Sequence, residues 1–187
     1  MHQAHGFDIY TVFSLWDTFR AAHPLLTLID QQSTNHFINT MLMQYDQGGL
    51  LPVWELAANE TNCMIGYHAV PVIVDAYMKG IREYDTKKAL DACIKSAMQD
   101  HFGLDSYKIK GYIPSDEESE SVSKTLEYAY DDWCIATMAK ELGREKEYQH
   151  FIKRAQYYKN IYDPQTGLLA IQLFCATGYF RHDEPVG

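Results

Sequence analysis

The sequence lacks the features that mark several classes of protein. It has no run of about 18 apolar residues, the length that a membrane-spanning helix needs. Its first residues form neither a basic stretch nor an apolar stretch, so no signal peptide is predicted. A net charge of -9 disfavours a nucleic-acid partner, because nucleic acids are bound by basic surfaces.

Cysteine is scarce and scattered. The four cysteines, Cys63, Cys93, Cys134 and Cys175, form no Cys-x-x-Cys pair. Three of them lie in helical apolar patterns, where a cysteine is typically a small buried thiol, so we expect no disulfide. The rest of the composition is that of a folded domain: 47% of the 187 residues are hydrophobic and 13% are aromatic.

The hydrophobic periodicity is helical along the chain and predicts an all-α fold. Six helices are expected, at residues 14–29 with a kink at Pro24, 33–48, 63–82, 85–97, 121–143 and 144–162. Residues 102–120, which include an acidic run, are expected to be a solvated connection. No repeat of about 34 or 40 residues is present, which disfavours a helical-repeat scaffold and favours hairpins that close into a toroid.

Residues 48–79 combine polar and apolar residues in an unusual way. A Gly-Gly turn precedes Trp54, and Glu60, His68 and Asp75 follow within an apolar background. Buried polar groups are costly unless they are satisfied, so the cluster is either a hydrogen-bonded core network or a binding site. The glycines and the tryptophan suit a loop that covers a small polar ligand with apolar faces, such as a sugar.

Three blocks of the sequence resemble glycoside hydrolase family 92. They are FSLWDTFR with the following HPL in residues 13–25, the GGLLPVW, ETNCMIG and PVIVDAYMKGI segments within residues 48–82, and VSKTLEYAYDDW at residues 122–133. The resemblance extends from residue 7 to about residue 167. It implies an all-α fold that is part, about half, of an (α/α)6 barrel built from helical hairpins.

The activity that the resemblance implies is that of a calcium-dependent, inverting exo-α-mannosidase, which removes terminal mannose from mannose-rich glycans as in N-glycan degradation. Inversion needs two carboxyl groups roughly 6.5–9.5 Å apart. The sequence does not show which of its carboxylates could pair. The motifs that carry the family's catalytic acid, catalytic base and calcium ligands lie beyond the matched blocks and are absent here. We therefore expect no catalytic residue and no metal ligand in this chain, which should be inactive alone.

Part of the wall that binds the mannose is expected instead. Asp17, next to Trp16, lies where the family places a sugar-binding aspartate, and a carboxylate can accept two hydroxyl hydrogen bonds. The alternative for Asp17 is a salt bridge with Arg20 within one helix. Gly49 is expected to offer backbone groups to the sugar, or else to be an ordinary helix C-cap.

The remaining substrate-binding candidates are Glu60, Tyr67, His68 and Trp54. Glu60 either contacts the ligand or lies at the positive end of the long helix. Tyr67 or His68 stands where some relatives have an arginine that holds the sugar, although a histidine on an apolar helix is more often a core residue. Trp54 either stacks on the sugar or packs the loop.

Three further aspartates are interpreted as structural. Asp75 is expected to form a buried pair, while Asp131 and Asp132 should face opposite sides of their helix.

The resemblance also implies boundaries. Residues 1–167 are expected to be a partial catalytic domain, without the family's preceding β-sandwich and without the C-terminal half of the barrel. Residues 168–187 diverge from the family pattern and are interpreted as a divergent C-terminal end, produced by a frameshift or by another alteration of the end. The intact parent should be periplasmic, cell-surface or secreted, and the start of this chain is most simply an internal position.

Two other function classes compete with this interpretation. One is another (α/α)6 hydrolase of the trehalase or glucoamylase type, which shares the fold but not the CM-x-G and TLEYAYDDW blocks. The other is a non-catalytic helical carbohydrate-binding or scaffold protein derived from the same fold. An incomplete barrel exposes apolar edges, so the chain alone is expected to self-associate.

Overall fold

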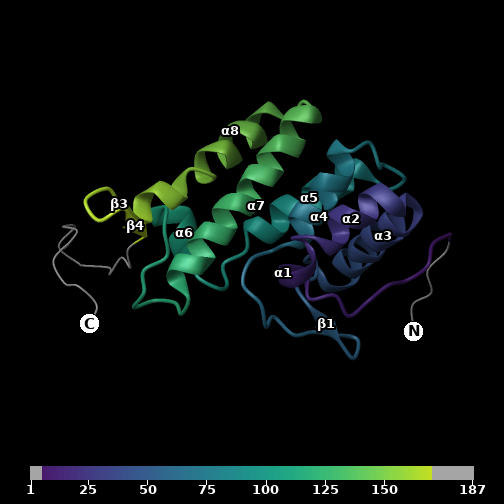
Figure 1. Ribbon diagram of the computed structural model, residues 1–187, viewed down its shortest axis with the longest axis horizontal. Coiled ribbons are helices and arrows are strands. Elements are labelled where there is room, and N and C mark those ends of the chain that lie inside the picture. Colours follow the sequence, from purple (N-terminus) through teal and green to yellow (C-terminus); the bar gives the residue numbers. More distant parts are fainter. Residues whose placement is uncertain (1–5, 170–187) are drawn as a thin grey trace.

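The computed structural model describes residues 6–169, which are mostly helical (Figure 1). The helices are α1 (Leu15–Thr18), α2 (Ala22–Ile29), α3 (Gln31–Gly48), α4 (Ala69–Met78), α5 (Thr86–Ala97), α6 (Leu104–Lys110), α7 (Ser121–Glu141), α8 (Glu145–Arg154) and the 3-10 helix η1 (Tyr157–Ile161). Two small antiparallel hairpins pair β1 (Glu55–Leu56) with β2 (Asn59–Glu60) and β3 (Tyr162–Asp163) with β4 (Leu168–Leu169). The predicted all-α class is confirmed, and the helical periodicity did not predict these short strands.

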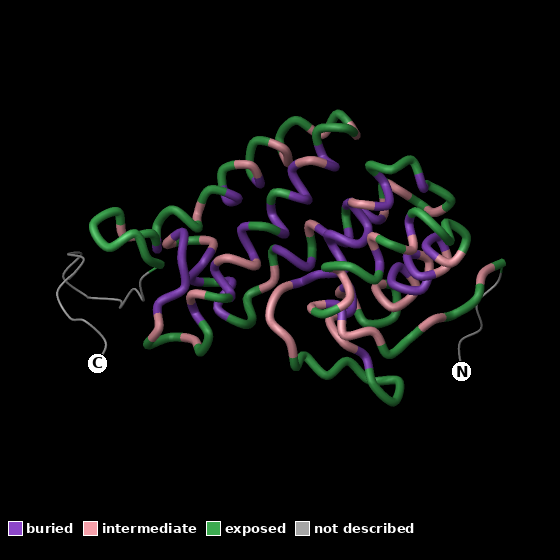
Figure 2. The backbone as a smooth tube through the Cα atoms, viewed as in Figure 1, coloured by how far each residue is buried: buried purple, intermediate pink, exposed green. Residues whose placement is uncertain are grey.

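The core is built around α4, which packs against α2, α3, α5 and α7. All but two of the residues of α4 are buried, as a helix whose residues are apolar except for Asp75 requires. Helices α7 and α8 form an antiparallel hairpin on one side of the molecule, while α2 and α3 lie at the other end (Figure 1). Buried backbone runs through α4, α5 and the inner side of α7 (Figure 2).

Local signals fixed several helix ends as expected. Asp85 caps α5 by accepting a hydrogen bond from the backbone N–H of Lys88 at 3.0 Å. Gly49 ends α3 in the left-handed conformation with φ 85°, and its N–H donates to the carbonyl of Tyr45. Gly143, also left-handed, follows α7. These boundaries depend only on nearby residues, which is why the pattern predicted them.

Three predicted helices are wrong in extent. The expected helix 14–29 breaks between α1 and α2, and Pro24 lies in the first turn of α2, where a missing N–H costs no hydrogen bond. The expected helix 63–82 spans only Ala69–Met78, because the preceding loop uses left-handed Asn62 and Gly66. The expected helix 144–162 consists of α8 followed by η1.

The connection at residues 102–120 is more structured than expected. It contains α6, whose Leu104 and Tyr107 are buried, and Tyr112 and Ile113 beyond it are buried as well. Its acidic part is solvated, since Asp116 and Glu117 are exposed, and Phe102 and Ile109 are exposed as well. The polar sequence around α6 obscured a short helix whose burial is set by contacts with distant elements.

Three of the cysteines and Asp75 were expected to be buried. Cys93 and Cys134 are buried free thiols as expected, Cys63 is an exposed free thiol, and Cys175 lies outside the described residues. The side chain of Asp75 is 35% exposed rather than buried, and it pairs with Lys79 at 2.6 Å. Within residues 6–169, no helix has the length and apolar character needed to cross a membrane.

Candidate sugar-binding wall

Helix α1 is a single turn that presents Asp17 to solvent. Ser14 donates its hydroxyl hydrogen bond to the carboxylate of Asp17. Arg20 does not pair with Asp17. It places Nη2 3.2 Å from Oε1 of Glu127, and its guanidinium carbon lies 4.5 Å from the ring centroid of Trp16. The alternative of an Asp17–Arg20 salt bridge is therefore wrong, and the Asp17 carboxylate remains accessible to a ligand.

Glu127 of α7 organises the inner side of α1, and it was not among the residues singled out from the sequence. Its carboxylate is 18% exposed. Oε1 accepts a hydrogen bond from the indole N–H of Trp16 at 3.3 Å as well as from Arg20, and Oε2 lies 3.1 Å from Nε2 of His68. Burial raises the pKa of Glu127, but His68 and Arg20 outweigh it, so the net shift is downward. Glu127 is thus an anion that contacts the His68 imidazole, the Arg20 guanidinium and the Trp16 indole N–H.

His68 is a buried cation between two carboxylates of α7. The ring is 1% exposed, and Nδ1 lies 2.9 Å from Oδ1 of Asp131, opposite the contact with Glu127. Burial lowers the pKa of His68, but Asp131 and Glu127 raise it more, to about 9. Phe19 stacks on the imidazole with ring centroids 4.2 Å apart. Asp131, Glu127 and Phe19 therefore enclose the imidazole ring.

Tyr67 joins the two consecutive aspartates of α7. Its backbone N–H donates to Oδ2 of Asp131 at 2.9 Å, and its hydroxyl donates to Oδ1 of Asp132 at 2.7 Å. Asp132 also accepts hydrogen bonds from Nε of Arg154 at 2.8 Å and from the hydroxyl of Tyr107 at 3.1 Å. Both aspartates are fully buried, as their structural interpretation requires. Since both contact Tyr67, the expectation that they face opposite sides of the helix is wrong.

Glu60 fixes the hairpin loop below α1. Its carboxylate accepts three backbone N–H hydrogen bonds, from Val53 at 2.8 Å, Trp54 at 3.1 Å and Asn62 at 2.9 Å. The proposed position at the N-terminus of the long helix is wrong, because α4 begins only at Ala69. The carboxylate instead stabilises the loop around β1 and β2.

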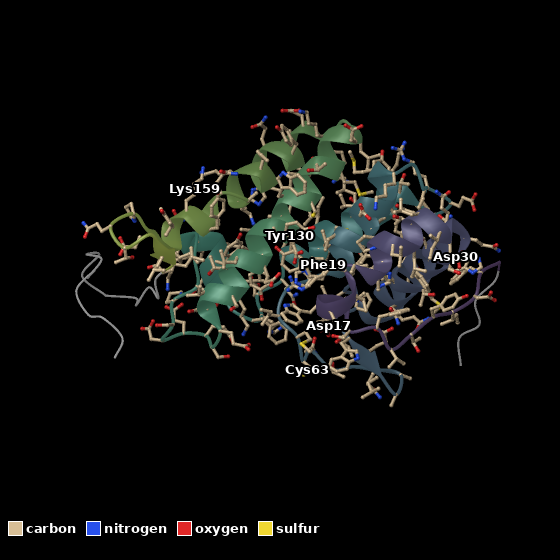
Figure 3. The ribbon with its side chains drawn as sticks, viewed as in Figure 1. Asp17, Phe19, Asp30, Cys63, Tyr130 and Lys159 are labelled. Atoms are coloured by element: carbon tan, nitrogen blue, oxygen red, sulfur yellow. The ribbon has the colours of Figure 1, made fainter. Side chains whose placement is uncertain are left out.

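The loop and α1 meet at the same end of the helix layer (Figure 1). The backbone N–H of Leu15 donates to the carbonyl of Val53 at 3.2 Å, and the N–H of Val12 donates to Oε1 of Glu55 at 3.1 Å. Asp17 and Cys63 lie toward this end, with Phe19 and Tyr130 above them (Figure 3). Asp17 and Glu60 therefore belong to one end, as a shared site requires.

A cavity of about 830 Å³ lies behind the hairpin. Among the substrate-binding candidates, Glu60 and Tyr67 line it, whereas Asp17, Trp16, Gly49, Trp54 and His68 do not. Gly49 acts as the C-cap of α3, and the carbonyl of Trp54 accepts hydrogen bonds from Thr61. The structure thus separates the candidates: Trp16 and Asp17 lie on α1, Trp54, Glu60 and Tyr67 lie in the segment between α3 and α4, Gly49 ends α3 and His68 is buried.

Residues 1–184 match the glycosyl hydrolase family 92 catalytic domain. The chain belongs to this family. The match includes most of the segment for which a divergent end was predicted. That segment lies almost wholly outside the described residues, and its boundary after Gly167 stays a prediction.

Solved family 92 structures resemble the chain over nearly its whole length. The α-mannosidase BT3965 from Bacteroides thetaiotaomicron, solved in complex with mannoimidazole, is 44% identical with a TM-score of 0.91, covering 98% of this chain and 24% of that one. The inverting mannosidase BT2199 from the same organism is 35% identical with a TM-score of 0.84, covering 97% of this chain and 25% of that one. An uncharacterized secreted glycosidase from Arthroderma benhamiae is 30% identical over 65% of this chain and 18% of its own length. The chain therefore spans about a quarter or less of these relatives.

Family 92 membership explains the incomplete appearance of the fold. The catalytic domain of the family is an (α/α)6 barrel, and this chain is part of it, as predicted. A partial barrel leaves helix faces without their neighbours. On α2, the side chains of Leu25, Leu28 and Ile29 are all more than half exposed.

The described residues do not fit a calcium ion. No group of three or more His, Cys, Asp or Glu side chains between residues 6 and 169 is arranged to hold a metal. Three carboxylates of α7 are already occupied by protein groups, Glu127 and Asp131 by His68, and Asp132 by Arg154. Calcium ligation by these residues would require breaking buried ion pairs.

Proposed function

We propose that this chain is a segment of a calcium-dependent, inverting exo-α-mannosidase, in which it forms part of the wall that binds the terminal mannose. The observation that carries the proposal is the Asp17 carboxylate, which is exposed on a turn fixed from both sides by Glu127 and by the backbone of Val53. An exposed, fixed carboxylate can accept hydrogen bonds from two neighbouring hydroxyl groups of a sugar. The mannosidases that match this chain support mannose as that sugar.

The chemistry is assigned to segments that this chain does not include. Inverting hydrolysis needs a carboxylic acid that protonates the leaving oxygen and a carboxylate that activates water. The fully buried Asp131 and Asp132 are held by Tyr67 and His68 or Arg154, so neither is free to take these roles. We propose that the acid, the base and the calcium ligands come from the remainder of the catalytic domain. The role of this chain is then to bind and orient the sugar.

The secreted relative supports export of the whole enzyme, with mannose-rich glycans outside the cytoplasm as its substrates. The intact enzyme is a family 92 protein that carries this segment together with the rest of its catalytic domain. The trehalase-type and glucoamylase-type alternatives are disfavoured by the family match. A non-catalytic carbohydrate-binding protein remains the second candidate, because the chain itself carries a wall without the acid and base.

Assays of an aryl α-mannoside test the proposal. The intact enzyme should release mannose of inverted, β configuration, and removal of calcium with a chelator should abolish this release. The 187-residue chain alone should release no mannose with or without calcium. Calcium-dependent activity of the chain alone, after host mannosidases are excluded, would show that the catalytic groups have been placed wrongly. An inactive intact enzyme that still binds mannose would favour the carbohydrate-binding alternative.

A further inference from the structure

Glu127 and Asp131 lie one turn apart on α7, and the buried ring of His68 lies between them. Nδ1 of His68 is 2.9 Å from Asp131 and Nε2 is 3.1 Å from Glu127. Asp131 and His68 are almost completely enclosed, at 0% and 1% exposure. Because the buried imidazolium is hardly screened by water, its charge attracts the Glu127 carboxylate from the inside of the protein, through an ion pair whose angles are not those of a hydrogen bond.

On its outer side, Glu127 holds α1. A single helical turn is not stable by itself, because nucleation is unfavourable, and α1 has only four residues. The Trp16 indole and the Arg20 guanidinium both donate to Oε1 of Glu127, at 3.3 Å and 3.2 Å. Trp16 directly precedes Asp17, and Arg20 follows three residues later. Trp16 and Arg20 therefore hold the chain on both sides of Asp17, whose carboxylate faces the solvent.

Phe19 ties the same turn to His68 by a second contact. Its ring stacks on the imidazole at 4.2 Å with an interplanar angle of 17°. The Arg20 guanidinium carbon lies 4.8 Å from the centroid of the Phe19 ring, so the aromatic and charged contacts form one cluster. The cluster connects the orientation of α1 directly to the pair of His68 and Glu127.

We propose that His68 and Glu127 are positioning residues, which orient Asp17 toward the sugar without touching the sugar themselves. The inference rests on the proposed function, because it requires Asp17 to bind the substrate. The buried imidazolium fixes Glu127, Glu127 fixes Trp16 and Arg20, and these two residues fix the turn that carries Asp17. Tyr67 or His68 was expected to stand where some relatives have an arginine that holds the sugar. In this proposal His68 contributes only indirectly, because it fixes the residues that hold Asp17. The raised pKa of His68, about 9, keeps it charged at neutral pH.

A double-mutant cycle in the intact enzyme tests this inference. Glu127→Gln keeps the shape of the side chain but removes its charge, and should lower kcat/KM by about tenfold, since misplacement of a binding group is costly. In an enzyme that already carries Asp17→Ala, the same substitution should lower kcat/KM by less than about twofold. A residue with a general structural role would instead reduce kcat/KM by the same factor in both backgrounds.

Two further variants keep the test sharp. Arg20→Gln changes a half-exposed side chain and carries less risk of misfolding, and it should show the same dependence on Asp17. Glu147→Gln is the matched control, because Glu147 also accepts a hydrogen bond from an arginine, Arg144, at 3.1 Å but lies on α8. This control should leave kcat/KM within about twofold of the unsubstituted enzyme. Thermal melting of each variant shows whether it is folded at the assay temperature.

Each outcome of the cycle decides one of the proposals. Loss of activity with Glu127→Gln or Arg20→Gln that disappears once Asp17 is removed supports the positioning role. A second outcome is that Asp17→Ala lowers kcat/KM, but Glu127→Gln and Arg20→Gln either have no effect or lower kcat/KM by the same factor with and without Asp17. The positioning role is then wrong, and the sugar-binding role of Asp17 stands. If Asp17→Ala itself leaves kcat/KM unchanged, the proposed function of this wall is wrong, and the positioning role falls with it.

Discussion

Gly66 and His68 are packed so closely that no side chain fits on Gly66. A Cβ atom built on Gly66 would lie 2.3 Å from Nε2 of His68, the atom that faces Glu127. Gly66 also has a φ of +81°, which residues other than glycine rarely adopt. The loop before α4 is thus shaped around the imidazole, and this explains why the chain there is not helical.

Substitution of Gly66 should therefore destabilise the protein by two mechanisms. Gly66→Ala introduces both the strain of a positive φ and the overlap with His68. Gly80→Ala is a matched control, because Gly80 has a φ of +84° but nothing within 4 Å of the built Cβ. We expect Gly66→Ala to lower the free energy of unfolding by about 1–3 kcal/mol more than Gly80→Ala does. Equal losses in urea unfolding experiments would mean that the loop can move away from the histidine.

The charge of His68 should make stability fall at alkaline pH. Its pKa is raised from 6.5 to about 9 in the folded protein, so the folded state holds this proton more tightly than the unfolded state. The stabilisation is fully present below pH 6.5 and is lost as the pH rises through about 9. By linkage it amounts to as much as about 3 kcal/mol. The groups that face the ring are Asp131 and Glu127, with Arg20 beyond the latter.

Urea unfolding of the protein and of His68→Gln between pH 6 and pH 10 measures this contribution. The difference in unfolding free energy between the two should be largest near pH 6 and should shrink toward pH 10. Tyrosine and cysteine side chains that titrate at alkaline pH affect both proteins and cancel in the difference. A difference that does not change with pH would contradict an imidazolium between Asp131 and Glu127.

The buried pair of Asp132 and Arg154 should be far more important for stability than pairs at the surface. Arg154 is 2% exposed, and besides Asp132 it donates to the carbonyl of Ala97 at 3.1 Å. Arg154→Met leaves the fully buried Asp132 without its cation, which should cost about 3–5 kcal/mol. The matched control is Arg144→Met, since Arg144 pairs with Asp91 and Glu147 at the surface. It should cost about 1 kcal/mol or less. If chemical denaturation showed similar losses of unfolding free energy for the two variants, protonation or water would be compensating Asp132 for the missing cation.

The exposed apolar side chains should cause the isolated chain to self-associate. Leu28 and Ile29 of α2 are 72% and 69% exposed, and Tyr130 and Trp133 of α7 are nearly half-exposed. Large apolar groups that lack neighbours favour association in water. Sedimentation or light scattering of the chain should show oligomers, and Leu28→Lys with Ile29→Lys should shift the population toward the monomer. A monomer with a sharp, cooperative melt before any substitution would contradict this expectation.

The sequence predicted those features that nearby residues determine. The cap of α5 by Asp85 and the end of α3 at Gly49 follow from local rules, and both are confirmed. The loop around Gly66 could not be predicted, because its shape depends on a ring that is fixed by α7. Glu127 was missed for a related reason. Its spacing of four residues from Asp131 placed both on one helix face, but nothing in the sequence showed that His68 and α1 would meet there.

The Asp17→Ala substitution in the intact enzyme tests the central claim most directly. Each lost charge-assisted hydrogen bond to a sugar hydroxyl should cost about 1.5–3 kcal/mol, so kcat/KM for an aryl α-mannoside should fall by roughly tenfold to a hundredfold. Asp91→Ala is the control, because Asp91 is an exposed aspartate that pairs with Arg144 on the surface of α5, and it should leave kcat/KM within about twofold. A fall with Asp17→Ala alone would place the mannose at this wall. Equal activities of the two variants would show that the sugar is held elsewhere.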